Sequence, residues 1–401
     1  MPSPSGDGLP VAARRPIPFQ EFVIKVHSRC NMACDYCYMY ESIDQSALAK
    51  NASMAADTLS RTLDRVAEHA ATHHLGRLRV VFHGGEPLLA GVHRLAAAAS
   101  HVRRRVGPDT IVDFVVQSNG LQLTRSRLEV LAAAGIRVGV SVDGDRQAMD
   151  RHRRTRTGGS AFDQIRTAIR LLGEYPDSYA GLLCVVDLDN DPVRTYEALL
   201  EHRPPRVDFL LPLGNWSNPP PGRPPTDDAP YGDWLVAVYD RWYDAPAAET
   251  RVRLFESILG LIAGRGSRSE SIGLSPTAVV VVDVDGAVEQ VDTLRTTFAG
   301  AVDTGLNIFD HTFDDALAHP DIMAQQAGIE ALSSICLSCP LHRICGGGYY
   351  PHRYRDGAGF ANPSVYCADL TRLIRHVLGR VGDDLARVRG KRDSGASPVR
   401  T

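Results

Sequence analysis

Seven of the eight cysteines in this 401-residue chain form two groups whose spacing suits metal binding. Cys30, Cys34 and Cys37 stand in CNMACDYC, directly after the apolar segment FVIKV. Three thiolates in one short loop can converge on one inorganic centre. A structural zinc site needs four ligands, and no fourth cysteine or suitably placed histidine lies nearby in the sequence. A [4Fe–4S] cluster held by three cysteines leaves one iron open, as a cluster that must bind and reduce a substrate requires.

The second group has the pattern of a closed four-ligand site. Cys336, Cys339 and Cys345 have the spacing C-x2-C-x5-C, and Cys367 follows after 21 further residues. Three consecutive glycines, 346–348, permit tight backbone turns beside these cysteines. From chemistry alone, zinc and an iron–sulfur cluster both fit. The eighth cysteine, Cys184, lies in the apolar run GLLCVV and is interpreted as a core residue.

Composition excludes several classes of protein. Lys and Arg number 44 against 47 Asp and Glu, a net charge of −3, so bulk charge does not favour nucleic-acid binding. No apolar run approaches the roughly 18–20 residues that cross a bilayer. The N-terminus has no hydrophobic segment typical of a secretory signal. We therefore expect a cytoplasmic protein with no membrane or nucleic-acid partner, where clustered cysteines more often bind metal than form disulfides.

The elements that must position the cysteines form an alternating pattern. Short β-branched runs alternate with amphipathic helical stretches, which predicts βαβ units and a parallel sheet. The predicted strands are 22–26, 78–82, 113–117, 137–142, 181–186 and 207–212, and the predicted helices are 54–72, 92–105, 124–134, 161–173 and 192–202. Six such units fit an open doubly wound sheet or an incomplete barrel, and periodicity does not separate the two. In both, the active site lies at the carboxyl ends of the strands.

The rest of the chain divides at a Pro-rich stretch, 203–230, which cannot be regular structure. A helix over 231–243 follows, and Asp285-Gly286 predicts the turn of a hairpin that starts near residue 276. We expect a flexible lead (1–19), a barrel (20–250), a bridging helix or linker (251–275), an iron–sulfur domain (276–387) and a disordered tail (388–401).

CNMACDYC resembles the signature of radical S-adenosylmethionine (SAM) enzymes. The resemblance implies an α/β fold, a partial (β/α)6 TIM-like barrel. It also implies that SAM chelates the open iron and is cleaved to a 5′-deoxyadenosyl radical. Tyr36 lies inside the motif. Gly84, Gly85, Glu86 and Pro87 resemble the family's GGEP motif, which holds the methionine amino group. Glycines let backbone carbonyls approach closely, and a carboxylate pairs with an ammonium, although a turn at a strand end is the alternative interpretation.

Further cofactor contacts follow from the same resemblance. Ser141, in SVDG, resembles the serine that contacts the SAM ribose, and Asn119, in QSNG, is a further candidate contact. Arg153, in RHRRTR, is the candidate partner of the SAM carboxylate. Arg154 and Arg156 compete for that role, and a solvated surface is the simpler explanation of the whole run.

The C-terminal cysteines resemble the distal auxiliary cluster of the SPASM extension of peptide-modifying radical SAM enzymes. Relatives usually carry seven such cysteines for two clusters, but here Val291 and Tyr349 stand at two of the expected positions. No cysteine lies between Cys184 and Cys336. We therefore expect a single auxiliary [4Fe–4S] cluster, with zinc as the alternative. Asp292 matches the proposed proton acceptor of sulfatase-maturating relatives, with a strand aspartate as the simpler alternative and Asp283 as a competitor.

Longer stretches, among them VFHGGEPLLAG and CGGGYYPHRYRDGAGFANPSVYCADL, resemble FxsB-type radical SAM/SPASM maturases over most of residues 20–375. The resemblance implies modification of a short ribosomal precursor peptide by joining an aromatic side chain to the Cβ of a nearby residue, which makes a cyclophane. It implies reduced flavodoxin or ferredoxin as the electron donor. Two alternatives remain open. One is a radical SAM enzyme that acts on a sulfatase residue, a sugar or an aminocyclitol, and the other is a non-catalytic iron–sulfur protein.

Overall fold

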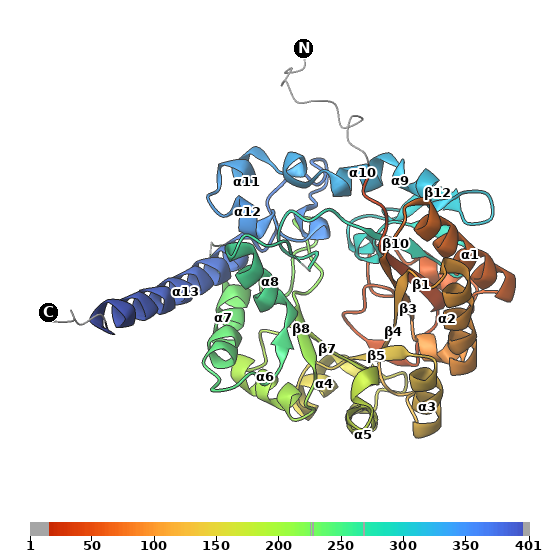
Figure 1. Ribbon diagram of the computed structural model, residues 1–401, viewed down its shortest axis with the longest axis horizontal. Helices are drawn as coiled ribbons and strands as arrows, with labels where there is room; N and C mark the ends of the chain where they lie inside the picture. The colour runs from red at the N-terminus through yellow and green to blue at the C-terminus, as the bar shows by residue number, and fades with distance from the viewer. Residues whose placement is uncertain (1–15, 225, 227, 268, 396–401) are drawn as a thin grey trace, which may run out of the picture.

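A curved, mostly parallel sheet organises the chain, as Figure 1 shows. The computed structural model describes residues 16–224, 226, 228–267 and 269–395. Its ten strands run in the order β12-β11-β10-β1-β3-β4-β5-β7-β8-β9, with no pairing that closes the sheet among the described residues. All six predicted strands are confirmed as parallel neighbours: β1 Glu21–His27, β3 Arg77–Gly84, β4 Ile111–Ser118, β5 Ile136–Ser141, β7 Tyr179–Val185 and β8 Arg206–Leu210. The fold is therefore the expected mixed α/β partial barrel.

The helices between the strands cover the outer face of the sheet (Figure 1). Alternating side chains of β1 explain this arrangement. Phe22, Ile24 and Val26 are fully buried on the helical side, and the residues between them face the barrel interior. The outer helices close to the predicted ranges are α1 Ala56–Thr72, α2 Val92–Val106, α3 Arg125–Ala133, α5 Phe162–Gly173, α6 Pro192–Leu200 and α7 Pro230–Tyr243.

The barrel interior is polar at its amino end, where ion pairs join adjacent strands. Arg79 of β3 pairs with Glu21 of β1 at 3.3 Å and with Asp113 of β4 at 3.0 Å. Arg137 of β5 donates to both oxygens of Asp113 at 2.7 Å. These side chains stay partly exposed, so each pair contributes little stability. Charged residues on the inner face are consistent with a barrel whose interior admits water.

The C-terminal region continues the barrel sheet. β10 (Val279–Val282) pairs in parallel with β1, and β11 (Ala287–Glu289) and β12 (Asp303–Asn307) follow as antiparallel strands. Gly286 has a φ of +84° in the β10–β11 turn, so the predicted hairpin is confirmed. The pairing of β10 with β1 was not predicted. The sheet is therefore continuous across the domain boundary expected at residue 276.

Several elements escaped the sequence analysis. They are β2 Met32–Cys34, β6 Arg153–Thr155, β9 Arg251–Val252, β12 Asp303–Asn307, α4 Arg146–His152, α9 Phe313–Leu317, α10 Pro320–Gln326, α11 Ser334–Ser338 and α12 His342–Cys345. α8 (Arg253–Ile262) falls within the bridging helix or linker expected over 251–275. The last helix, α13 (Cys367–Gly395), projects from the body (Figure 1). It is helical through Gly395, within the tail expected from residue 388 to be disordered.

Both predicted flexible ends fall partly outside the described residues, which exclude 1–15 and 396–401. Within the predicted lead, Phe19 is fully buried and packs against Phe313, so ordered structure starts before residue 20. Within the described part of the chain, every helix is too short or too polar to traverse a lipid bilayer.

Candidate active site

The first cysteine loop follows β1 and is pinned to the barrel by a small antiparallel sheet. Within it, β2 pairs with β6, and Cys34 lies opposite Arg153. Cys30, Cys34 and Cys37 are all free and partly exposed. Burial raises the pKa of Cys37 to about 11. Thiols in such surroundings become thiolate ligands when a metal supplies the compensating charge. The loop thus offers three convergent sulfur donors.

Gly84 and Gly85, at the end of β3, provide the space into which this loop packs. A Cβ on Gly85 would lie 2.5 Å from the Arg29 carbonyl oxygen and closer still to the Tyr40 hydroxyl. Gly84 has a φ of +125°, and a Cβ there would overlap the His27 carbonyl. The Gly85 amide donates to that carbonyl at 2.8 Å. Only glycine fits at either position, because the backbones touch directly.

Glu86 joins the end of β3 to the end of β4. Its fully buried carboxylate accepts hydrogen bonds from the Ser118 hydroxyl at 2.9 Å and from the amides of Asn119 at 2.8 Å and Leu88 at 3.0 Å. Pro87 begins the 3-10 helix η3 (Pro87–Ala90). Proline suits this position because the first residue of a helix has no partner within the helix for an amide hydrogen. The structure therefore gives Glu86 a positioning role, with three of its lone pairs already occupied.

Asn119 connects that junction to the cysteine loop. Its Nδ2 donates to Asn31 Oδ1 at 2.8 Å and lies 3.5 Å from Cys30 Sγ. Hydrogen bonds to a cysteine sulfur stabilise the thiolate form. Asn119 is therefore placed to contact a metal-bound sulfur.

Tyr36, Asp143 and Arg153 form a buried trio beside Cys34. Arg153 Nη1 donates to the Tyr36 hydroxyl at 2.8 Å, and that hydroxyl donates to Asp143. Burial disfavours the charge on Arg153, but Tyr36 and Asp143 outweigh burial and raise its pKa. Arg153 is 7% exposed and its Nε has no partner among the described residues. The competing Arg154 points out to solvent, because alternate residues of β6 face opposite ways.

Arg156, the other competitor, is exposed and donates to the Cys30 carbonyl at 3.1 Å. The structure thus brings Arg153 into the interior and leaves Arg154 and Arg156 on the rim. Asp143, which orients Tyr36 and accepts the Val185 amide at 3.0 Å, was missed. Its place in VDG, after a predicted strand, was the available signal.

A polar layer crosses the barrel interior near the carboxyl ends of the strands. Lys25 of β1 stands beside His83 of β3 in the sheet register. On the next strands, Gln117 donates to the Ser141 hydroxyl at 3.0 Å. Gly139 leaves the space for Gln117, since a Cβ there would overlap the amide. Ser141 is thus confirmed at a strand end, facing the same interior.

Asp292 belongs to a buried charge cluster at the edge of this layer, which we define as Lys25, Arg295, Asp283, Glu289 and Asp292. Lys25 Nζ lies 2.5 Å from Asp292, 2.6 Å from Glu289 and 3.5 Å from Asp283. Arg295 Nη2 lies 2.9 Å from Glu289. Burial opposes the charge on Lys25, but the three carboxylates prevail and raise its pKa.

The predicted competitor Asp283 is fully engaged in this charge cluster. Burial opposes its charge, but Lys25 and Lys50 outweigh burial and hold its pKa below the usual range. Asp292 differs, because neither of its oxygens has a partner with hydrogen-bond geometry among the described residues. Of the two aspartates, Asp292 is the one that can still accept a hydrogen bond.

The second cysteine group lies in the C-terminal region. Cys336 is in α11, Cys339 ends that helix, Cys345 ends α12 and Cys367 begins α13. Gly346, Gly347 and Gly348 all have positive φ, and a Cβ on Gly346 would overlap the Gly273 carbonyl. Arg353 donates to the carbonyls of Gly346 and Gly348 at 2.6 and 2.7 Å, which fixes this turn.

Neither cysteine group has the spacing of a preformed single-ion site. Zinc–sulfur bonds of about 2.3 Å place tetrahedral sulfur atoms about 3.8 Å apart. Among the described residues, only His69, His73 and Asp314 form a group of three candidate ligand atoms all within 4.8 Å. In that group, His69 Nε2 accepts the Phe19 amide and its Nδ1 contacts Asp314 at 2.8 Å, so both nitrogens are engaged.

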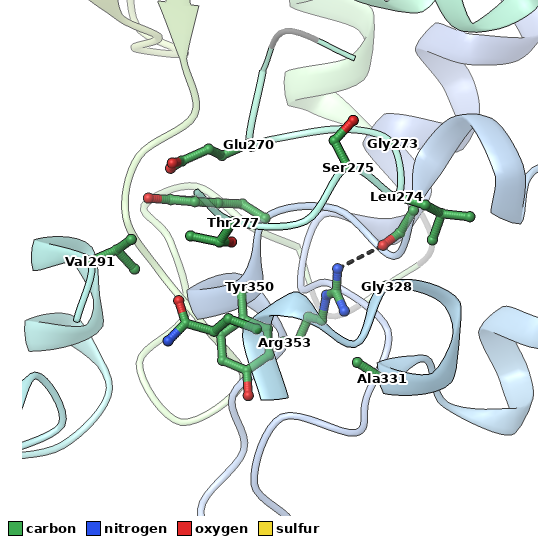
Figure 2. Close-up of a pocket in the computed structure, with 13 residues that line it drawn as sticks. Glu270, Gly273, Leu274, Ser275, Thr277, Val291, Gly328, Ala331, Tyr350 and Arg353 are labelled. Carbon is green, nitrogen blue, oxygen red and sulfur yellow. Dashed lines mark hydrogen bonds between the residues drawn. The ribbon is translucent and has the colours of Figure 1, made fainter. Parts of the chain in front are cut away.

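The two residues at expected cysteine positions, Val291 and Tyr349, line one cavity of about 40 Å³ (Figure 2). The Tyr349 hydroxyl bonds Thr293 at 2.6 Å and also bonds Glu270, which lines the same cavity. This volume accommodates only a few water molecules. An aliphatic and a phenol side chain thus line this cavity, and neither supplies a soft metal ligand.

The sequence model of the radical SAM superfamily matches residues 24–199, which include the first cysteine loop and GGEP. A cysteine-type anaerobic sulfatase-maturating enzyme of Clostridium novyi is 21% identical over 85% of this chain and 90% of its own length. A serine-type enzyme of Bacteroides thetaiotaomicron is 22% identical over 60% of this chain and 61% of its own.

Among solved structures, native anSMEcpe with bound AdoMet superposes with a TM-score of 0.78 at 22% identity, covering 90% of this chain and 98% of that one. Streptococcus suis SuiB gives a TM-score of 0.56 at 17% identity over 85% of this chain and 77% of its own. Residues 24–199 therefore match the radical SAM superfamily, and this match implies a SAM-binding [4Fe–4S] cluster. The chain is homologous to the anaerobic sulfatase-maturating enzymes.

Proposed function

We propose that this protein is a radical SAM enzyme that oxidises a side chain of a peptide substrate. The observation that carries the proposal is the close packing of a three-cysteine loop onto Gly84 and Gly85 within the radical SAM domain. The three cysteines then lie near the backbone that follows β3, at the carboxyl end of the barrel, where parallel-sheet enzymes have their active sites.

The donor set fits the implied cluster and cofactor. Cys30, Cys34 and Cys37 would hold the cluster and leave one iron for the methionine moiety. The backbone at Gly84–Pro87 would receive the amino group and Arg153 the carboxylate, since the Nε of Arg153 is buried without a partner. Asn119, Tyr36 and Ser141 would complete the cofactor pocket. Bound SAM, when cleaved reductively, would supply a radical that removes a hydrogen atom from the substrate.

The chain's own residues would bind, orient and exclude water. The Tyr36–Asp143–Arg153 trio holds the cysteine loop against β6 and β7. Asp292 pairs with Lys25 through Oδ1, and its Oδ2, which has no hydrogen-bond partner among the described residues, is available to a donor on the substrate. A radical oxidation releases a proton as well as an electron, so a group that accepts a proton is needed near the reacting atom.

A peptide is the favoured substrate because similar proteins bind peptides. anSMEcpe was solved with a Cp18Cys peptide, and SuiB was solved with its precursor peptide SuiA. Within this class we propose the finer reaction implied by the FxsB-type resemblance, in which an aromatic ring is joined to the Cβ of a nearby residue. Reduced flavodoxin or ferredoxin would supply the first electron.

We further propose one auxiliary [4Fe–4S] cluster, held by Cys336, Cys339, Cys345 and Cys367. The absence of a single-ion spacing among them favours a cluster over zinc. Val291 and Tyr349 occupy the positions that a second auxiliary cluster would use. The barrel (20–250) and the iron–sulfur region (276–387) would then each hold one cluster.

The test is anaerobic reconstitution followed by incubation with SAM, dithionite and a candidate precursor peptide encoded beside the gene. We expect release of 5′-deoxyadenosine, a peptide mass lower by two hydrogens per ring, and loss of fragmentation within the ring. Cys30→Ala should abolish all three, and Cys184→Ala, in the core, serves as the matched control. If 5′-deoxyadenosine forms but the peptide mass does not change, the chosen peptide is not the substrate. If no 5′-deoxyadenosine forms with any peptide, the proposal that the protein is a radical SAM enzyme is wrong.

Sulfatase maturation is the second candidate, favoured by homology to cysteine- and serine-type maturases. A sulfatase-derived peptide tested in parallel separates the two. Oxidation of one cysteine or serine leaves backbone fragmentation complete, whereas a crosslink suppresses it between the joined residues.

A further inference from the structure

His83 occupies the centre of the polar layer and has no role in the function proposed so far. It is the penultimate residue of β3, directly before Gly84. Its register partner is Lys25 of β1, and Lys25 in turn contacts Asp292 at 2.5 Å. His83 therefore lies at the carboxyl end of the barrel, between the cofactor loop and the buried charge cluster.

Two groups in this region lack hydrogen bonds. In the described part of the chain, the buried His83 Nδ1 has no hydrogen-bond partner, and the Asp292 oxygens have none with hydrogen-bond geometry, although Lys25 Nζ lies 2.5 Å from Asp292 Oδ1. Only 7% of the Asp292 surface is exposed to solvent. A buried imidazole nitrogen without a hydrogen bond, near a carboxyl group that is held only by ion pairs, points to a ligand that completes the site.

The charges around these two groups assign them different tasks. Asp292 lies 2.5 Å from Lys25 Nζ and 3.8 Å from Arg295 Nε, so two cations hold its side chain in place. Burial lowers the pKa of His83, Asp292 opposes that shift, and Lys25 adds to it. Behind them lie Glu289 and Asp283, both bound to Lys25. His83, whose pKa burial lowers, thus lies near the Lys25–Asp292 ion pair.

We propose that His83 accepts the proton that the substrate loses, and that Asp292, positioned by Lys25 and Arg295, stabilises the imidazolium. This deepens the proposed function and rests on it. An imidazole nitrogen without a partner can accept a proton, whereas Asp292 is already paired with Lys25 at 2.5 Å. The pairing of imidazole with a fixed carboxylate is a common means of stabilising the charged product.

The proposed crosslink forms in two stages. The substrate first loses a hydrogen atom, and the resulting radical adds to the aromatic ring. The ring adduct then gives one electron to an oxidised iron–sulfur cluster and one proton to His83. The ring C–H bond breaks, its electron pair restores the aromatic ring, and an N–H bond forms on the imidazole. Overall the peptide loses two hydrogens.

The experiment compares wild-type enzyme with His83→Gln, which keeps a polar side chain and cannot act as a base near neutral pH. Both are reconstituted in full and given SAM, dithionite and the peptide. We expect crosslinked product to fall by about 10²–10⁴-fold, the contribution typical of a general base. Release of 5′-deoxyadenosine should fall by less than about threefold, because hydrogen abstraction precedes the proton transfer. Freeze-quenched samples should accumulate an organic radical in electron paramagnetic resonance.

The pH profile separates catalysis from structure. In the wild type, product formation should decline as pH falls through the pKa of His83, which burial places below 6.5. Asp292→Asn should move that decline to lower pH, because the carboxylate favours the imidazolium. His202→Gln is the matched control, since His202 also has a lowered pKa but lies at the end of α6, away from the layer.

Two results would overturn the assignment of His83. One is a His83→Gln enzyme that keeps the wild-type rate and pH profile. The other is a His83→Gln enzyme in which product and 5′-deoxyadenosine fall equally with no accumulated radical, which indicates a structural role. Failure of the wild type itself to release 5′-deoxyadenosine would instead overturn the proposed function.

Discussion

Replacing Lys25 by Met should destabilise the protein strongly at neutral pH. The Lys25 side chain is fully buried and contacts three carboxylates, so its removal leaves negative charges that Arg295 alone does not balance. Breaking a buried ion pair by deleting one partner costs about 3–5 kcal/mol. An unfolding entropy of about 2.1 cal/mol/K per residue gives about 0.8 kcal/mol/K for 401 residues, so the melting temperature should fall by about 4–6 °C.

The pH dependence of this loss is the sharper test. Because the pKa of Lys25 is raised on folding, its contribution is complete below the unfolded value of about 10.4 and is lost only above it. The wild-type contribution is therefore constant between about pH 5.5 and 7.5. In Lys25→Met, carboxylates such as Glu289, whose pKa burial already raises, take up protons as pH falls. The deficit should shrink toward pH 5.5.

The assay is thermal melting at several pH values under anaerobic conditions, at one scan rate, with variants reconstituted in parallel. Lys50→Met is the matched control, because Lys50 also contacts Asp283 and Glu289 but is partly exposed. It should lose less stability than Lys25→Met. A Lys25→Met protein that melts like the wild type at pH 7.5, or whose deficit grows in acid, would refute the reasoning.

Three further predictions concern the metal and cofactor sites. Gly85→Ala should prevent the cysteine loop from docking and lower the iron content by about half, whereas Gly76→Ala, with open space around it, should not; iron analysis measures both. Arg153→Met should weaken SAM binding about 10–100-fold, the value of a charge-assisted hydrogen bond, while Arg154→Met leaves calorimetric affinity unchanged. Wild-type enzyme should hold about eight irons and Cys336→Ser about four; about twelve, or four with one zinc, would reject a single auxiliary cluster.

Local pattern predicted the local structure well. Runs of β-branched residues located all six barrel strands, and Asp285-Gly286 located the hairpin, because each signal lies within a few residues. The partners of a strand are not encoded in that way. β10 pairs with β1 through contacts between distant segments, and the three-residue strands β2 and β6 are too short to show a period.

The site was predictable where motifs carried it and not where the fold assembled it. Cys30 and Gly85 stand in short sequence patterns. Arg153 was the first candidate from its motif, and the β6 register, which buries Arg153 and exposes Arg154, adds a structural reason to prefer it. Lys25 was visible as a charge inside an apolar strand, but its partner Asp283 lies 258 positions away in the chain.

That separation has a consequence for biosynthesis. At about 5–20 residues per second, the ribosome finishes β10 roughly 13–50 s after β1. Throughout that interval one edge of β1, with its apolar side chains and unpaired amides, is open to other chains. Such high contact order slows folding and exposes the nascent chain to aggregation. The yield of recombinant protein should therefore rise with added chaperones and at lower growth temperatures. This determines how much protein is obtained for reconstitution.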